Sequence, residues 1–173
     1  MTAPTATLKP RKSLAGVCGL FCPACTLRLG TLEDPARLEA SAARFNLPVE
    51  HLRCEGCRTE VRGFYCRECR MSNCAAEKGI DFCHECGEYP CLDLKQFQAA
   101  RPHRLELWEN LARIREAGFE AWFEEKLNHH ACPECGTLNS AYDPACRRCG
   151  HEPGSEFVRR HKADIERYLK ENR

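Results

Sequence analysis

The most regular hydrophobic pattern of the chain lies over residues 103–127, HRLELWENLARIREAGFEAWFEEKL. Leu107, Leu111 and Ile114 recur at intervals of three or four residues, which places their side chains on one face of an α-helix. Both tryptophans of the protein widen this face. The pattern predicts a long amphipathic helix, bent at Gly118, that packs against the rest of the protein. A helix that binds a partner through the same aromatic face is a second interpretation.

Shorter helices are predicted from the residues that typically begin or end them. Asp34 followed by Pro35 is typical of the residue before a helix and of its first position, and Gly79 suits the left-handed conformation that ends many helices. Ser155 is a typical capping residue. These signals, together with the apolar spacing, predict helices over residues 35–45, 73–79, 91–100 and 155–171.

The composition indicates that apolar burial alone does not hold this fold together. Leu, Ile, Val and Phe together number 32 of the 173 residues, too few for one large apolar core. Ile and Val contribute only seven of these, which argues against an extended β-sheet. We therefore predict a small, metal-organised, mainly α protein with irregular cysteine-containing turns, and with minor β content at its C-terminal end.

Charge and hydropathy exclude two classes of protein and favour one compartment. The net charge of +1 at pH 7 excludes a strongly basic nucleic-acid binder by composition. No apolar run approaches the roughly 20 residues that cross a bilayer. The basic residues Lys9, Arg11 and Lys12 are not followed by the apolar stretch of a secretory signal. We therefore expect a cytoplasmic protein, in which thiols stay reduced.

Cysteine is the most informative residue type, with 15 in the chain. An odd number excludes complete pairing into disulfides. Five CxxC pairs lie outside the N-terminal group of cysteines. Two intervening residues allow a tight turn, here called a knuckle, to direct both thiolates at one metal ion. A redox dithiol would need a βαβ context, which the pattern lacks. We predict that all fifteen are metal ligands: Cys18, Cys22, Cys25, Cys54, Cys57, Cys66, Cys69, Cys74, Cys83, Cys86, Cys91, Cys132, Cys135, Cys146 and Cys149.

The last four cysteines have the most specific spacing. Cys132 and Cys135 form one knuckle, and Cys146 and Cys149 form another after ten intervening residues, which is the pattern of a zinc ribbon. Four thiolates complete a tetrahedral Zn²⁺ site and leave no position for a substrate. The predicted role of this site is structural.

The eleven N-terminal cysteines allow more than one division among metal sites. In chain order, Cys54, Cys57, Cys66 and Cys69 form one set, and Cys74, Cys83, Cys86 and Cys91 form another. The spacing CxxC-x4-C occurs twice, from Cys66 and again from Cys83, which predicts two related knuckle-and-helix units side by side. Because each repeat carries three cysteines, the sets can also interleave.

The remaining triplet, Cys18-x3-Cys22-x2-Cys25, has two interpretations. It forms a zinc site with a fourth ligand from His51, His84 or His103, or it holds three irons of a [4Fe–4S] cluster. The same spacing occurs in enzymes that cleave S-adenosylmethionine, but those enzymes surround the cluster with a barrel that a region of this size does not supply. An unmetallated, reactive triplet is the remaining alternative.

These motifs in order resemble a known family. The segments CGLFCPAC from Cys18, CEGC from Cys54, CRECRMSNCAAEKG from Cys66 and CHECGEYPC from Cys83 are similar to the prokaryotic cysteine-rich domain of unknown function numbered 3795, which is often followed by a zinc ribbon. The resemblance covers about residues 14–100, although residues 71–73 (MSN) stand where a more basic segment is expected. It implies metal binding and supplies no catalytic residue.

The sequence therefore predicts five regions: a disordered arm (1–13), a cysteine-rich metal-binding domain (14–100), an aromatic amphipathic helix (101–128), a zinc ribbon (129–151) and a terminal helix (152–173). No acid–base or nucleophilic motif is recognisable. We expect three or four Zn²⁺ per chain in a non-enzymatic module that binds another protein. The alternatives are an iron–sulfur redox or sensing protein using Cys18, Cys22 and Cys25, and a nucleic-acid-binding zinc-ribbon protein.

Overall fold

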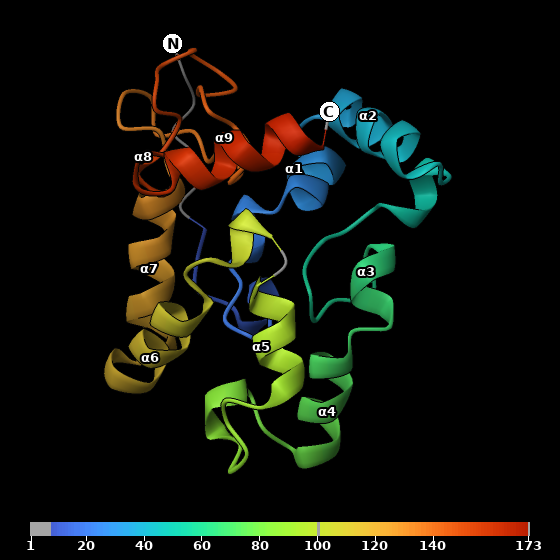
Figure 1. Ribbon diagram of the computed structural model, residues 1–173, viewed down its shortest axis with the longest axis vertical. Helices are drawn as coiled ribbons and strands as arrows, with labels where there is room; N and C mark the ends of the chain where they lie inside the picture. The colour runs from blue at the N-terminus through green and yellow to red at the C-terminus, as the bar shows by residue number, and fades with distance from the viewer. Residues whose placement is uncertain (1–7, 100, 173) are drawn as a thin grey trace.

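The computed structural model of the chain describes residues 8–99 and 101–172, and within them the fold is mainly helical (Figure 1). In this part of the chain, β structure is limited to two isolated antiparallel bridges, one between Ala15 and Phe21 and one between Ala131 and Leu138. The α-helices are α1 (Thr26–Leu32), α2 (Pro35–Phe45), α3 (Phe64–Arg67), α4 (Arg70–Lys78), α5 (Leu92–Ala99), α6 (Leu107–Ala117), α7 (Phe119–His130), α8 (Glu156–Arg160) and α9 (Lys162–Glu171).

The predicted helix ends agree with the structure where a local signal fixes them. The Asp34 carboxylate accepts a hydrogen bond from the backbone N–H of Arg37 and caps α2, as short polar side chains do at helix N-termini. Gly79 ends α4 with φ +64°, although α4 begins at Arg70, three residues before the predicted start. The Ser155 hydroxyl accepts from Val158 N–H at the start of α8. Ala100, the predicted end of α5, lies outside the described residues.

The long helix predicted over residues 103–127 is wrong: the segment forms a hairpin of two helices, α6 and α7. Gly118, between them, has φ +86° and ψ +164°, a backbone conformation that is nearly restricted to glycine. The chain reverses there, and α6 and α7 lie side by side (Figure 1). The Arg113 guanidinium forms an ion pair with Glu125 across the hairpin, at 2.6 Å.

Replacing Gly118 with alanine is expected to lower the free energy of unfolding by about 1–3 kcal/mol, the cost of holding an L-residue in this region of φ and ψ. A Cβ at this position would meet no atom closer than 4.0 Å, so backbone strain is the cause rather than a clash. Urea denaturation measures the difference. As a control, Gly87→Ala adds a methyl group with nothing within 4 Å and no positive φ, and should cost less. Equal effects of the two substitutions would contradict the strain argument.

The aromatic face of the hairpin forms the main core and is not free for a partner. Trp122 and Phe123 are fully buried, and Phe119 is 6% exposed. The ring of Phe21, from the N-terminal cysteine-rich region, packs edge-on against Trp122 and Phe123 with centroids 5.9 and 5.2 Å away. Trp108 is half-buried and packs against Tyr89. The hairpin therefore completes the core of the N-terminal region.

The arm predicted over residues 1–13 is described only from Leu8 onward, because residues 1–7 lie outside the described residues. Leu8 packs against the main core, and Lys12 begins a short 3₁₀ turn and forms an ion pair with Asp81. The last part of this segment is thus attached to the folded protein.

The C-terminal segments pack against the rest of the chain. The predicted helix over 155–171 is divided at His161 into α8 and α9, and Phe157, Val158 and Ile165 from these helices form a second small core. α7 runs through the predicted boundary at residues 128/129 and ends at His130. The His130 ring is stacked between Phe21 and Phe157, with centroids 5.5 and 4.9 Å away.

A buried carboxylate connects three of these helices. The Glu106 side chain, 2% exposed, lies just before α6 and accepts hydrogen bonds from Lys126 at 2.5 Å on α7 and from Arg160 at 3.3 Å on α8. The Nε2 atoms of His129 and His161 each lie 2.9 Å from the same carboxylate. Burial opposes ionisation, but the His129 hydrogen bond and the Lys126 charge outweigh it, so the pKa of Glu106 is lowered below its usual range.

Candidate metal centre

Two similar knuckles follow α7 and position the last four cysteines. In each knuckle, the N–H of a glycine donates to the C=O of the first cysteine at 2.9 Å: Gly136 to Cys132, and Gly150 to Cys146. Both glycines have positive φ, +71° and +75°, which a residue with a Cβ adopts only at a cost. This local hydrogen bonding turns both cysteines of each pair toward the same side.

A buried asparagine holds the two knuckles together. Asn139 is fully buried, and its amide N–H groups donate to the C=O of Thr137 at 3.0 Å and of Gly154 at 2.6 Å. Its side-chain oxygen accepts from Arg147 N–H at 3.0 Å, within the second knuckle. Asn139 gives no signal in the sequence, because its role depends on a contact between the knuckles and not on the spacing of the cysteines.

The four sulfur atoms form a compact cluster. Cys132 Sγ lies 3.6 Å from Cys149 Sγ, and Cys135 Sγ lies 3.6 Å from Cys146 Sγ. The four sulfur atoms all lie within 4.8 Å of one another. Four ligands at a Zn–S distance of about 2.3 Å would be separated by about 3.8 Å in a tetrahedron. The arrangement therefore matches the size of a tetrahedral thiolate site.

The backbone around this cluster favours thiolates. Burial opposes ionisation of Cys146, but the N–H groups of Cys149 and Arg148 donate to its sulfur and lower its pKa to about 6. Cys135 also has a lowered pKa, chiefly through hydrogen bonds to Thr137. A hydrogen bond with the His151 backbone favours ionisation of Cys149, but the neighbouring Cys135 and Cys132 outweigh it and raise the pKa of Cys149 to about 12. Because thiolates are the form that binds metal, the contacts of Cys146 and Cys135 favour the metal-binding form of those two ligands.

The three cysteines of the N-terminal triplet face different neighbours. Cys57 N–H donates to Cys22 Sγ at 3.4 Å. Burial raises the pKa of Cys25 to about 11, with a further contribution from the nearby Cys54. Burial also raises the pKa of Cys18 to about 12, with a further contribution from Cys83. These contacts place the triplet beside Cys54, Cys57 and Cys83.

Other contacts between N-terminal cysteines lie within the two sets that follow chain order. The sulfur atoms of Cys57 and Cys66 lie 3.9 Å apart, which is close to the spacing in a tetrahedral site. Burial raises the pKa of Cys83 to about 12, and the nearby Cys91 and Cys74 raise it further. Thiolates that lie close together repel one another, and a bound cation removes that repulsion.

The histidines proposed as a fourth ligand for the triplet have other surroundings. His103 is bonded through Nδ1 to the hydroxyl of Tyr142 at 2.6 Å, and His51 is exposed in a short 3₁₀ turn. The His84 ring is stacked on Phe82, and its Nδ1 is buried without a hydrogen-bond partner. Across residues 8–99 and 101–172, three or more potential metal ligands from His, Cys, Asp or Glu lie within 4.8 Å of one another in one group only, the four C-terminal cysteines.

The two copies of the CxxC-x4-C spacing produce related but unequal units. Each copy leads into a helix, α4 in the first and α5 in the second, and these helices are in contact (Figure 1). Cys74 lies within α4, whereas Cys91 directly precedes α5. The repeated spacing therefore predicts the pairing of the units but not the position of the third cysteine.

The fold and the cysteine cluster define a cysteine-rich, mainly helical protein with a candidate metal-binding group of four cysteines. Residues 14–96 match the model of the family described as a protein of unknown function, DUF3795. No match was found among curated proteins or among solved structures. No helix in the described ranges combines the length and the apolar character needed to span a membrane.

Proposed function

We propose that the chain is a zinc-binding, non-enzymatic cytoplasmic module whose metal sites organise a surface for another protein. The observation that carries this proposal is the C-terminal cluster, in which four sulfur atoms lie within 4.8 Å of one another. Four thiolates fill the tetrahedral coordination of Zn²⁺, and a filled site has no position for a substrate. The metal therefore stabilises structure.

The pairing of basic side chains supports a protein partner over a nucleic acid. The basic run near the C-terminus is neutralised by the chain's own carboxylates: Arg159 pairs with Glu156, Arg160 with Glu109, and Lys162 with Glu166. Basic side chains that already form ion pairs contribute less to binding the phosphate groups of a nucleic acid. Several large apolar side chains are exposed instead, with Leu92 at 69% and Tyr65 at 50%.

Elemental analysis of protein purified without oxygen tests the choice of metal. We expect three or four zinc ions per chain, because fifteen thiolates grouped in fours support three complete sites and one incomplete site. The Cys146→Ser variant should contain one zinc fewer. Stoichiometric iron and sulfide would contradict the zinc assignment and support an iron–sulfur protein that uses Cys18, Cys22 and Cys25.

Comparative co-purification tests the partner class. Wild-type protein and Cys146→Ser are recovered from the same cells, and the bound material is analysed for protein and for nucleic acid. We expect a protein in stoichiometric amount with the wild type and less with the variant. Nucleic acid that is bound tightly, and that salt releases steeply, would contradict the proposal.

A further inference from the structure

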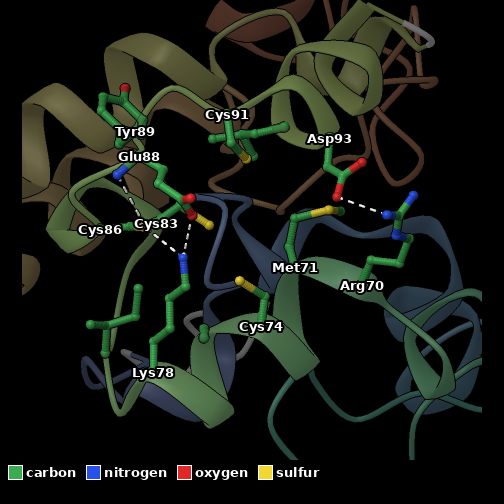
Figure 2. Close-up of a pocket in the computed structure, with 13 residues that line it drawn as sticks. Arg70, Met71, Cys74, Lys78, Cys83, Cys86, Glu88, Tyr89, Cys91 and Asp93 are labelled. Atoms are coloured by element: carbon green, nitrogen blue, oxygen red, sulfur yellow. Dashed lines mark hydrogen bonds and ion pairs between the residues drawn. The ribbon is translucent and has the colours of Figure 1, made fainter.

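A pocket between α4 and α5 gathers four of the N-terminal cysteines (Figure 2). Cys74 enters it from α4, Cys83 and Cys86 from the second repeat's knuckle, and Cys91 from the residue before α5. Figure 2 shows the sulfur atoms of Cys74 and Cys91 facing the pocket from its two sides. Residues up to 17 positions apart in the sequence therefore direct thiols toward one space.

Apolar packing explains little of how these two helices are held. Within α4 the buried residue is Ala75, and within the described part of α5 it is Leu94. The other side chains of both helices are exposed or half-buried. Met71 of α4 and Phe97 of α5 add half-buried contacts with the main core, and the exposed ion pair of Arg70 with Asp93 joins the two helices. The four thiols are the further groups that are placed to link them.

Two donors already surround one of these sulfur atoms. The ammonium group of Lys78 lies 3.2 Å from Cys86 Sγ and 2.5 Å from a Glu88 carboxylate oxygen. The backbone N–H of Glu88 points to the same sulfur at 3.5 Å. A site in which four thiolates hold a divalent cation carries a net charge of −2, and donors of this kind stabilise metal-bound thiolates. Lys78 lies one helical turn after Cys74 on α4, so both project from the same face.

We propose that Cys74, Cys83, Cys86 and Cys91 form a second four-thiolate site for Zn²⁺, with Lys78 donating a hydrogen bond to the Cys86 thiolate. These four sulfur atoms are farther apart than those of the C-terminal cluster. In the described ranges, that cluster alone has all of its sulfur atoms within 4.8 Å of one another. The side chains of Cys74 and Cys91 are exposed, so they are free to turn onto the ion. Metal binding then draws α5 toward α4. This proposal rests on the proposed zinc-binding function. The site binds its zinc ion independently of the C-terminal cluster.

Thiol labelling of the wild-type protein tests the site without a substitution. Zinc-loaded protein is treated with an alkylating reagent, and each modified cysteine is identified by mass spectrometry. We expect Cys74 and Cys91 to be protected together with Cys83 and Cys86, and all four to react after chelation. Rapid labelling of Cys74 and Cys91 while Cys132–Cys149 remain protected would overturn this inference and leave the C-terminal site intact. Labelling of every cysteine would contradict the proposed function as well.

A matched pair of variants tests the role of Lys78. Lys78→Gln keeps all four thiols and replaces the charged ammonium donor beside Cys86 with a neutral amide on a shorter side chain. Arg70→Gln removes an exposed ion pair with Asp93 on the rim of the same pocket. In competition with a chromophoric chelator, Lys78→Gln should weaken one zinc site by about 10–100-fold, and Arg70→Gln should leave every site unchanged. An unchanged affinity in Lys78→Gln, or an equal loss in both variants, would overturn the assignment of Lys78.

Discussion

Removal of zinc from the C-terminal cluster is expected to unfold residues 131–154. The buried residues of this segment that are not cysteine are mostly small or polar, among them Thr137, Asn139 and Ser140, and Leu138 is the one large apolar group. Full burial of one leucine contributes roughly 1.5–3 kcal/mol, whereas a structural zinc site contributes about 10–16 kcal/mol of apparent binding free energy. A zinc ion held by the cluster, as proposed above, would therefore be the dominant stabilising contact of the segment.

Hydrogen exchange with mass spectrometry measures this effect. In Cys146→Ser, the amides of residues 131–154 should lose protection, while those of α6 and α7 keep most of theirs because Trp122 and Phe123 remain buried. Chelation followed by added zinc provides the control, since protection should return in the wild type and not in the variant. Retained protection of the segment in metal-free protein would contradict a structural role for the cluster.

Replacement of the buried carboxylate Glu106 has the second largest expected effect. Glu106→Gln leaves Lys126 and Arg160 without their common partner, and removing one member of a buried ion pair costs about 3–5 kcal/mol. Glu125→Gln is the matched control, because it breaks an ion pair whose two side chains are about half exposed. That pair should contribute only about 0–1 kcal/mol. Urea denaturation at neutral pH measures both differences.

The effect of Glu106 should depend on pH in a defined direction. Its folded-state pKa is lowered, so its contribution to stability is complete above the ordinary glutamate range, about 4.3. The contribution is lost as pH falls from that range toward the lowered folded-state pKa. The difference in unfolding free energy between the wild type and Glu106→Gln should therefore shrink in acid. A difference that grows on acidification would contradict this account.

The sequence predicts helices best where a single local contact decides their ends. Asp34, Gly79 and Ser155 act through their own side chain or backbone conformation, so their signals are readable without the fold. Gly118 carries a weaker signal, because a glycine inside an amphipathic pattern fits a bent helix as well as a hairpin. The packing of Phe21 on the hairpin decides between them, and that contact joins residues about 100 positions apart.

The same distinction holds for the candidate site: ligands with a fixed local spacing are predictable from the sequence, and contacts that form only in the folded chain are not. The C-terminal cluster is predictable because its ligands come from two knuckles with fixed spacing. The N-terminal cysteines are not, because Cys22 meets Cys57 and Cys57 meets Cys66 only after the chain folds back. Glu106 gives no signal at all, since a carboxylate between two leucines is usually a solvent-exposed position of a helix. The position of Lys78 beside the cysteines is predictable from the sequence, because Lys78 follows Cys74 by four residues in a helix.

The contact of Phe21 with the α6–α7 hairpin has a consequence for how the chain can be divided. The region that matches the family model ends at residue 96, but the rings of Trp122 and Phe123 that cover Phe21 come more than twenty residues later. Asn110 also donates a hydrogen bond to the C=O of Gly19 at 2.9 Å, and Leu111 fills the space above that glycine. A fragment cut at residue 96 would expose these surfaces to solvent and lose much of the main core, while keeping the smaller cluster around Leu38, Ala42 and Leu52. A unit that folds with its main core intact must therefore include α6 and α7, beyond the end of the matched region.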